Sequence, residues 1–418
     1  MSLVYERKIN GPATHAFVIG VGAYPYAKPG ASPFGPNTPL PLSNVPDLDS
    51  APVGAKLFCD WVISHADGLP APLGSVHIAL SAPPPAPSSA TQYEWKSRFA
   101  TGSAVDPRGN SIAVSSTDAV SIQKDGTDWS QRLLSVPNQV AIFYICGHGA
   151  AVPTRSIVLL SDVAGGPIAT KSPWESHIDV QYLAGIMSRQ PELQEGYLFV
   201  DACQEVITDV VLGQIDSSVG IGDTLRFFPP SLAMTKNKVL LLVPGPMGQL
   251  TYDDGKAGGG RFTQVLVEAL NGAGARNYSG AGQWGVLLDG LPRAMNILYR
   301  LRGWPLDAFN PTPVRSFVSS GPIVRYQTPP EVPFAVMLDP AIAINQADQV
   351  CLRDAADNVI AARADRAEQW IGRAQARMDL CYLQATFAKE NANYRSQSIT
   401  RVDLSEMRVD PVLLHRVT

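Results

Sequence analysis

Features that would place this chain of 418 residues in several large classes of protein are missing. Basic residues are not in surplus, because 33 Lys and Arg stand against 37 Asp and Glu and leave a net charge of −4. Nucleic-acid binding is therefore not indicated. No apolar run approaches the roughly 20 residues that cross a bilayer, and the amino terminus lacks a basic segment followed by an apolar core. We expect a cytoplasmic protein that makes no use of a membrane.

Cysteine is also scarce, and its distribution excludes two common uses. The number of cysteines is odd, and their positions lack the paired spacing of zinc ligands. Reduced thiols fit this pattern better than a disulfide framework or a metal site, so no metal is predicted and one thiol can be free to react. The cysteines are Cys59, Cys146, Cys203, Cys351 and Cys381.

The first 325 residues alternate between short apolar runs and helical patterns. Such alternation predicts right-handed crossovers and an α/β fold in which helices flank a mostly parallel sheet. A helix is expected from Ser50, with Val53 and Leu57 on its apolar face together with Phe58. The expected strands are 15–24, 76–80, 140–145, 197–200 and 239–243, and further helices are expected at 128–135, 178–189 and 260–270.

Beyond about residue 325 the sequence changes to short alternating segments. These predict a small all-β sandwich, with Asp357 and Asn358 in a hairpin turn between two of its strands. A chain of this length is also too long for one compact core. We therefore expect two domains, 1–325 and 326–418.

Two short segments stand at the ends of apolar runs that read as buried strands. Residues 146–149 are Cys-Gly-His-Gly and follow the run 140–145, whereas residues 201–204 are Asp-Ala-Cys-Gln and follow the run 197–200. The carboxyl ends of parallel strands meet at one edge of a sheet, where ligands and catalytic groups gather. His148 and Cys203 are therefore expected to face one crevice.

These segments resemble the caspase-like clan of cysteine peptidases, which includes metacaspases and bacterial caspase-like proteins. In caspases the His precedes the Cys by roughly 50 residues, and here Cys203 follows His148 by 55 residues. The segments 15–24 and 260–270 are similar to the first strand and a late helix of that family, so the likeness covers about residues 13–300. It implies a caspase-like sheet and a cysteine endopeptidase.

A thiol becomes a strong nucleophile when a neighbouring imidazole takes its proton, so Cys203 and His148 are the candidate catalytic residues. The resemblance implies that the backbone N–H groups of Gly149 and Cys203 hold the oxyanion, and His148 could return a proton to the leaving amine. Taken alone, such a Cys is more often a small buried hydrophobe and such a His a loop residue. Their occurrence together, in this order, favours catalysis.

Asp201 is the candidate substrate-binding residue. Metacaspase-like enzymes carry an acid two positions before the nucleophile and cut after Arg or Lys, so the resemblance implies a basic substrate. A carboxylate that caps a loop or turn is the alternative. The family also implies a second acidic residue, for which Asp47 and Asp49 align only loosely. The chain departs from the family at residues 204–205, where Gln-Glu replaces small residues and puts the shape beside the nucleophile in doubt.

Two further expectations concern activation. Asp253 and Asp254 are candidates for binding a basic substrate or Ca²⁺, since some metacaspases need that ion, although a solvated flexible loop is the favoured interpretation of that segment. Residues 204–238 contain Arg226, Lys236 and Lys238, so cleavage after one of them could mature the enzyme, with an uncut surface loop as the equal alternative.

The sequence thus predicts a peptidase that cuts a protein or peptide after Arg or Lys. By analogy with bacterial relatives it would activate a companion protein in defence or regulated cell death. The rival from another class is a catalytically inactive scaffold whose β domain binds proteins. A nucleotide site at residues 20–22 (Gly-Val-Gly) is disfavoured, because a third glycine is absent and prolines follow instead of a helix.

Overall fold

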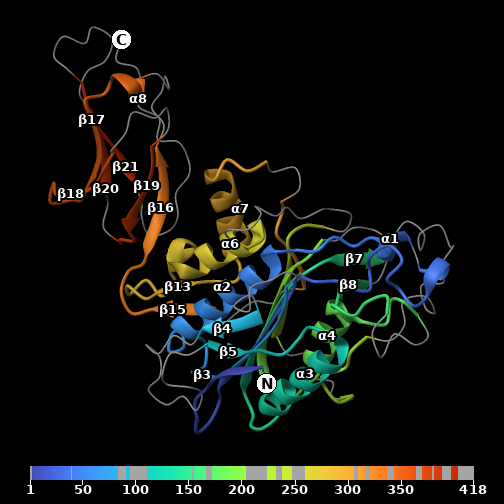
Figure 1. Ribbon diagram of the computed structural model, residues 1–418. Helices are drawn as coiled ribbons and strands as arrows, with labels where there is room; N and C mark the ends of the chain where they lie inside the picture. Colours follow the sequence, from blue (N-terminus) through green and yellow to red (C-terminus); the bar gives the residue numbers. More distant parts are fainter. Residues whose placement is uncertain are drawn as a thin grey trace. The chain divides into compact units, whose positions relative to one another are not determined.

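The structure is a computed structural model that describes residues 2–38, 40–82, 91–94, 111–152, 155–165, 172–203, 224–231, 238–246, 259–305, 309–315, 321–336, 343–363, 370–378, 381–387 and 397–402. The chain is an α/β protein with one large, mostly parallel sheet flanked by helices, together with several small sheets (Figure 1). This part of the predicted fold is confirmed.

Contacts divide the chain into two compact units at places other than residue 325. The first unit comprises Met1–Val267 and Pro305–Ser319, and the second comprises Glu268–Trp304 and Ser320–Thr418. The segment after residue 267 therefore groups with the β-rich end of the chain, although it lies well before the expected boundary.

The central sheet belongs to the first unit. Within the described residues its strand order is β1-β3-β2-β6-β10-β11-β14. The five inner strands run parallel, and β1 and β14 pair antiparallel at the two edges. The bounds are β1 Leu3–Glu6, β2 Thr14–Val21, β3 Leu73–Ser81, β6 Gln139–Cys146, β10 Leu193–Asp201, β11 Lys238–Val243 and β14 Thr312–Arg315.

Helices cover both faces of this sheet (Figure 1). On one face lies α2 (Ser50–Ser64), where Phe58 stacks on Tyr144 with ring centroids 4.5 Å apart. On the other face lies α3 (Ala119–Leu133), where Trp129 packs against Phe143 at 5.9 Å. The strands are accordingly buried on both sides and read as continuous apolar runs. The remaining helices of this unit include α1 Leu40–Ser43, α4 Val180–Met187 and α6 Arg261–Glu268.

Gly20 and Gly22, at the end of β2, leave room for the start of α2 and the backbone around it. A Cβ atom at Gly20 would come within 2.8 Å of the Ala51 carbonyl oxygen, and one at Gly22 within 2.7 Å of two other carbonyl oxygens. The buried face of α2 differs from the expected apolar face. Phe58 is buried as expected, whereas Val53 and Leu57 are only half-buried. The Gly-Val-Gly segment therefore has a packing reason that needs no nucleotide.

Helix α3 begins earlier than its apolar pattern predicts. Asp118 precedes the first helical residue, and its side chain accepts hydrogen bonds from the Ser121 backbone N–H at 2.9 Å and the Ser121 hydroxyl at 2.8 Å. This N-cap satisfies donors that the first turn leaves unpaired. The Asp118 cap thus sets the start of α3. The apolar spacing of the sequence predicted only the second half of this helix.

The strand order creates a switch point beside β2. After β2 the chain passes through α2 to β3 on one side, and then through α3 to β6 on the other. Open α/β sheets bind ligands outside the carboxyl ends of the strands at such a point. The loops that follow β2 and β6 therefore meet at the edge where a site is expected.

Among the described residues of the first unit, two small sheets accompany the central one. One is β7-β8-β9, with β7 Gly149–Val152, β8 Arg155–Leu159 and β9 His177–Asp179, and the other joins β4 Gln92–Glu94 to β5 Ser111–Ala113. Since β7 begins directly after His148 and pairs antiparallel with β8, this hairpin holds the His-bearing loop.

The second unit contains two helices and three small sheets within its described residues. The helices are α7 Leu291–Leu301 and α8 Ala343–Gln346, with a single wider turn at Ala269–Ala273. The sheets are β12-β13-β15, β16-β19 and β18-β17-β20-β21. Their bounds are β12 Ala275–Asn277, β13 Trp284–Val286, β15 Val324–Tyr326, β16 Glu331–Val336, β17 Gln349–Arg353, β18 Val359–Ala362, β19 Trp370–Gln375, β20 Cys381–Thr386 and β21 Gln397–Val402.

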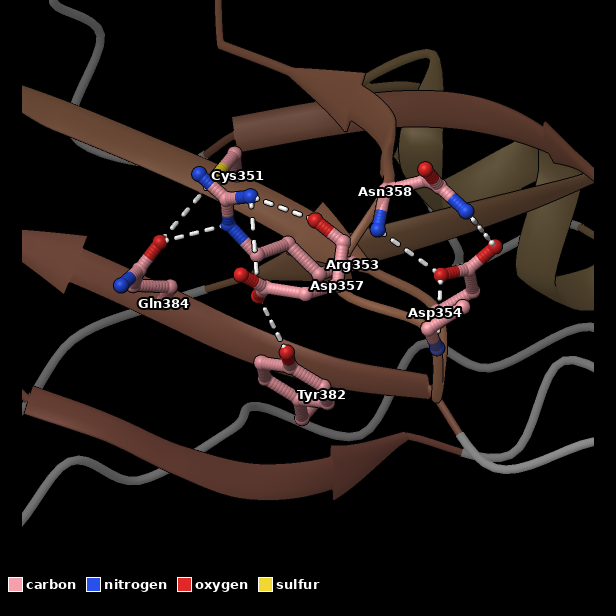
Figure 2. A network of polar contacts seen from close by, with 8 residues as sticks. Cys351, Arg353, Asp354, Asp357, Asn358, Tyr382 and Gln384 are labelled. Atoms are coloured by element: carbon pink, nitrogen blue, oxygen red, sulfur yellow. Dashed lines mark hydrogen bonds and ion pairs between the residues drawn. The ribbon is translucent and has the colours of Figure 1, made fainter.

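The predicted hairpin turn between β17 and β18 is present (Figure 2). Asp357 has a positive φ of 69°, which Asp tolerates better than most residues. The Asp354 side chain accepts hydrogen bonds from the backbone N–H groups of Ala356 at 3.0 Å and Asn358 at 2.9 Å, and Tyr382 donates to Asp357 at 2.5 Å. These contacts account for the polar cluster at this turn.

Among the described helices, none is both long and apolar enough to span a bilayer.

Candidate functional site

The two predicted catalytic residues leave adjacent strands at the same edge of the sheet. Cys146, the last residue of β6, lies opposite Asp201, the last residue of β10. One residue further, the Gly147 N–H donates a 3.2 Å hydrogen bond to the Asp201 carbonyl. His148 and Cys203 therefore begin neighbouring loops at one edge of the sheet, and the expectation that they face one crevice stays a prediction.

The His148 imidazole is oriented by a main-chain carbonyl. Its Nε2 lies 2.8 Å from the carbonyl oxygen of Pro46. Because a carbonyl can only accept, Nε2 must carry the proton, and in the neutral ring Nδ1 is then the basic nitrogen. In a catalytic triad a third group likewise holds the base through one ring nitrogen. Here a peptide carbonyl holds the His148 imidazole.

Tyr24 fixes the loop that carries His148. Its hydroxyl accepts a 2.8 Å hydrogen bond from the His148 backbone N–H and donates to the Val21 carbonyl at 3.2 Å. The tyrosine and imidazole rings pack with centroids 5.1 Å apart. Burial raises the pKa of Tyr24 well above its ordinary value, although the bond from His148 works against this rise. The hydroxyl therefore stays protonated at physiological pH.

Gly147 makes room for this tyrosine. A Cβ atom at that position would lie 2.9 Å from the Tyr24 hydroxyl and 3.1 Å from the Val21 Cβ. The glycine before His148 thus allows the hydroxyl to approach the loop backbone closely.

Gly149 brings the His-bearing loop against the Cys-bearing one. A Cβ atom at Gly149 would lie only 2.3 Å from the Cys203 carbonyl oxygen and 2.9 Å from the Ala202 Cβ. The absence of a side chain at Gly149 therefore allows the two loop backbones to approach closely. The use of the Gly149 and Cys203 N–H groups as an oxyanion hole stays a prediction.

Cys203 differs in exposure from the other cysteines. It is half-buried, whereas all four others are buried, including Cys146 at 4% exposure. A reagent or substrate can therefore reach Cys203 more readily than the neighbouring thiol of Cys146, which belongs to the core.

Asp201 has a structural role in addition to its position near Cys203. It is 5% exposed, and its Oδ2 accepts hydrogen bonds from Thr263 Oγ1 at 2.5 Å and from the Thr263 N–H at 3.3 Å. Thr263 lies in the first turn of α6, so the carboxylate caps this helix. Tyr144 continues this series of hydrogen bonds. Because the Thr263 hydroxyl donates its one proton to Asp201, the Tyr144 hydroxyl must be the donor in its bond to Thr263.

The alternative that Asp201 caps local structure therefore has direct support, since the helix contact uses one carboxylate oxygen. A Cβ atom at Gly260 would lie 2.4 Å from the same oxygen, so a glycine before α6 leaves the space that the carboxylate occupies. A role in substrate binding would have to coexist with these contacts.

The two loosely aligned acids lie in different surroundings. Asp47 follows Pro46 and pairs with Lys28 at 2.9 Å. Asp49 directly precedes α2 and makes no side-chain capping bond there.

Two of the three expected cleavage positions lie in ordered backbone. The Arg226 N–H and carbonyl both bond to the Gln123 side chain, at 3.1 and 2.8 Å, and the next residue, Phe227, is buried. Lys238 is the first residue of β11 in the central sheet. Cleavage after either would require local unfolding. Lys236, the Ca²⁺ candidates Asp253 and Asp254, and the departures at 204–205 lie outside the described residues.

The described part of the chain contains no group of three or more His, Cys, Asp or Glu side chains arranged to hold a metal ion.

Sequence reasoning missed three groups that build this site: the Pro46 carbonyl, the Tyr24 hydroxyl and Thr263. The first has no sequence signal, because any residue supplies a carbonyl and its place depends on the fold of a proline-rich loop. Tyr24 had a usable signal, since it follows the strand next to the switch point. Thr263 could have been suspected because it lies in the first turn of a helix that follows glycines.

Comparisons with known proteins leave the activity open. No family model matches the chain. A protein of Sinorhizobium fredii (strain NBRC 101917 / NGR234), described as uncharacterized protein y4kE, is 26% identical over 237 residues, which are 56% of this chain and 59% of that protein. The match thus spans about three fifths of the relative's length.

Proposed function

We propose that the chain is a cysteine endopeptidase of the caspase-like clan, with Cys203 as nucleophile and His148 as base. One observation carries the proposal: at the edge of a parallel sheet, a half-buried thiol and an imidazole begin adjacent loops, and the imidazole is held through Nε2 by the Pro46 carbonyl. The proposal rests on residues and geometry, because the similar protein carries no assigned activity.

The finer fold assignment is part of this proposal. The mostly parallel sheet with helices on both faces accords with the caspase-like fold that the sequence resembles. The sheets β16-β19 and β18-β17-β20-β21 share an apolar core that includes Phe334, Leu352 and Leu383, which accords with a small β sandwich.

The reaction would proceed in two halves. The Cys203 thiol gives its proton to Nδ1 of His148, and the sulfur attacks the scissile carbonyl carbon while the C=O electron pair moves to oxygen. Backbone N–H groups of Gly149 and Cys203 would hold that oxyanion. Collapse breaks the C–N bond, and His148 returns the proton to the leaving amine. Water activated by the same imidazole then hydrolyses the thioester and restores the thiol.

A preference for Arg or Lys before the cut is the second element of the proposal. Asp201 supplies a buried negative charge two residues before the nucleophile, and pairing with a guanidinium would compensate it. Its bonds to Thr263 give the competing explanation that the carboxylate serves only to cap α6.

Two substitutions separate these roles. Asp201→Asn keeps an oxygen for the Thr263 bonds but removes the charge, whereas Thr263→Val removes the hydroxyl and keeps the charge. If Asp201 selects the substrate, Asp201→Asn lowers kcat/KM for Arg peptides selectively, and Thr263→Val chiefly lowers stability. Equal preference for Arg over neutral residues in wild type and Asp201→Asn would remove the specificity claim and leave a helix cap.

Labelling tests the nucleophile. A thiol-reactive peptide with Arg at its reactive end should modify one cysteine, identified by mass spectrometry as Cys203. Cys203→Ala should abolish labelling, and Cys146→Ala, which removes the neighbouring buried thiol, should retain it. Peptide cleavage by the Cys203→Ala protein would exclude the assignment. A folded wild-type chain that neither labels nor cleaves would favour the non-catalytic scaffold.

A further inference from the structure

The loop after β2 folds back on itself beside the candidate site. In the returning segment 45–48, the Leu48 N–H donates to the Gly22 carbonyl at 2.8 Å. The Val45 carbonyl accepts a hydrogen bond from the Lys28 ammonium at 2.8 Å. The segment that contains Pro46 is thus attached at both ends to the residues that follow β2.

Asp47 joins the same two stretches through its side chain. Its Oδ1 accepts a 3.0 Å hydrogen bond from the Tyr24 N–H and lies 2.9 Å from the Lys28 ammonium. Lys28 therefore contacts both residues that flank Pro46. We refer to Lys28 and Asp47 as the loop clamp.

These contacts form a closed series of bonds that includes His148. Asp47 holds the Tyr24 backbone, the Tyr24 hydroxyl holds the His148 backbone, and His148 Nε2 donates to Pro46, which is bonded covalently to Asp47. Proline has a fixed φ and no N–H of its own, so neighbouring residues must set the direction of its carbonyl. The clamp supplies the contacts that do so.

We propose that Lys28 and Asp47 are positioning residues: the loop clamp holds the Pro46 carbonyl where it keeps His148 in the Nε2–H tautomer, which makes Nδ1 the basic nitrogen of the ring. This inference rests on the proposed function for its catalytic meaning. It also gives Asp47 a role other than that of the second substrate-binding acid implied by the family resemblance.

The two roles of Asp47 predict different kinetics. The Lys28 and Asp47 side chains are 32% and 28% exposed, so the ion pair itself contributes little to stability. A misplaced catalytic group has a larger effect on rate, roughly 100-fold for a displacement of 1 Å. Loss of the clamp should therefore lower kcat for Arg and non-Arg peptides alike, whereas loss of a substrate-binding acid would raise KM for Arg peptides alone.

The test uses the full chain and two readouts that need no substrate. The first is the ¹⁵N–¹H spectrum of the histidine rings, with His148 assigned through His148→Gln, which distinguishes the Nε2–H from the Nδ1–H tautomer. The second is the rate at which iodoacetamide alkylates Cys203 at fixed pH. The variants are Lys28→Gln and Asp47→Asn, with Lys28→Arg as the charge-conserving variant.

The control removes an ion pair of equal N···O distance at another place in the same unit. Arg7 donates to Asp67 at 2.9 Å, and the two side chains are 30% and 73% exposed. Arg7→Gln should leave the His148 spectrum and the Cys203 alkylation rate unchanged.

We expect Lys28→Gln and Asp47→Asn to lower the Nε2–H population and to slow alkylation of Cys203 by roughly 10-fold, and Lys28→Arg to stay within about twofold of wild type. Wild-type spectra and rates in both clamp variants would overturn the proposal, as would an equal loss in Arg7→Gln. If Asp47→Asn does not fold, the proposal is tested by comparing the Nε2–H population and the alkylation rate of Lys28→Gln with those of Lys28→Arg. Should wild type cleave no peptide while the clamp variants still change both readouts, the peptidase assignment fails and the clamp stands.

Discussion

Two buried histidines in the central sheet should make the first unit sensitive to mild acid. His15 in β2 is hydrogen-bonded through Nδ1 to Ser75 at 2.8 Å, and His77 in β3 is bonded through Nδ1 to Ser2 at 3.1 Å. The His77 Nε2 atom has no partner among the described residues. Burial, with a smaller effect of the positive charge of Arg132, lowers the pKa of His15 to about 4 and that of His77 to about 3.

The direction and size of the change in unfolding free energy with pH follow from proton binding to the two histidines. The folded chain keeps both rings neutral, while the unfolded chain takes up protons below a pKa of about 6.5. The contribution of the two histidines to stability is therefore fully present above pH 6.5. It is lost as the pH falls towards their folded-state pKa values of about 4 and about 3. At pH 5 each ring lowers the unfolding free energy by about 2 kcal/mol and the pair by about 4 kcal/mol, from 1.36 kcal/mol per pH unit.

Urea unfolding at pH 7 and pH 5, followed by tryptophan fluorescence, measures this effect. Trp129 reports on the region because its indole N–H donates to the His15 carbonyl at 3.0 Å. The variant His77→Gln should be less stable at both pH values but should lose about 2 kcal/mol less between them. Asp125 and Asp162 have pKa values raised by burial and act in the opposite direction, but they are common to both proteins. An equal loss in wild type and variant would refute the reasoning.

Three further predictions concern packing and local geometry. Asp118→Ala removes the N-cap bonds to Ser121 and should lower the unfolding free energy by about 1 kcal/mol in urea titrations, with Asp118→Asn close to wild type. Phe58→Ala removes a fully buried ring that stacks on the sheet and should cost about 3–5 kcal/mol by the same measurement, so a cost below 1 kcal/mol would contradict the packing described. Gly149→Ala puts a methyl group 2.3 Å from the Cys203 carbonyl and should slow alkylation of Cys203 by at least roughly 10-fold, whereas a wild-type rate would show that the two loops are not closely packed.

Most of the central sheet could be predicted from the sequence, because its strands are buried on both faces and read as uninterrupted apolar runs. All five expected strands are present, among them 140–145 within β6 and 239–243 within β11. The start of α3 could not be predicted from apolar spacing, since the Asp118 cap sets it. Strand β19 cannot be predicted from apolar alternation alone, because its residues alternate weakly and include Gly372, which lies against the Phe334 ring.

The candidate site was predictable in part for the same reason. The order of strands and the residues at their ends suffice to bring His148 and Cys203 to one edge. The groups that orient them are carbonyl and hydroxyl oxygens whose positions depend on long-range folding, as with Pro46, which is 102 residues from His148. For Asp201, sequence position indicated the site, but only the fold reveals the competing contact with Thr263.

The dependence of Cys203 and His148 on each other tests the central claim most directly. The measurement is kcat/KM for a fluorogenic peptide ending in Arg, in wild type, Cys203→Ala, His148→Ala and the double variant. If the two residues act as one unit, each single change lowers the rate by several orders of magnitude and the double variant is no slower than the worse single variant. Losses that multiply in the double variant, or a Cys203→Ala protein that still cleaves, would contradict the account.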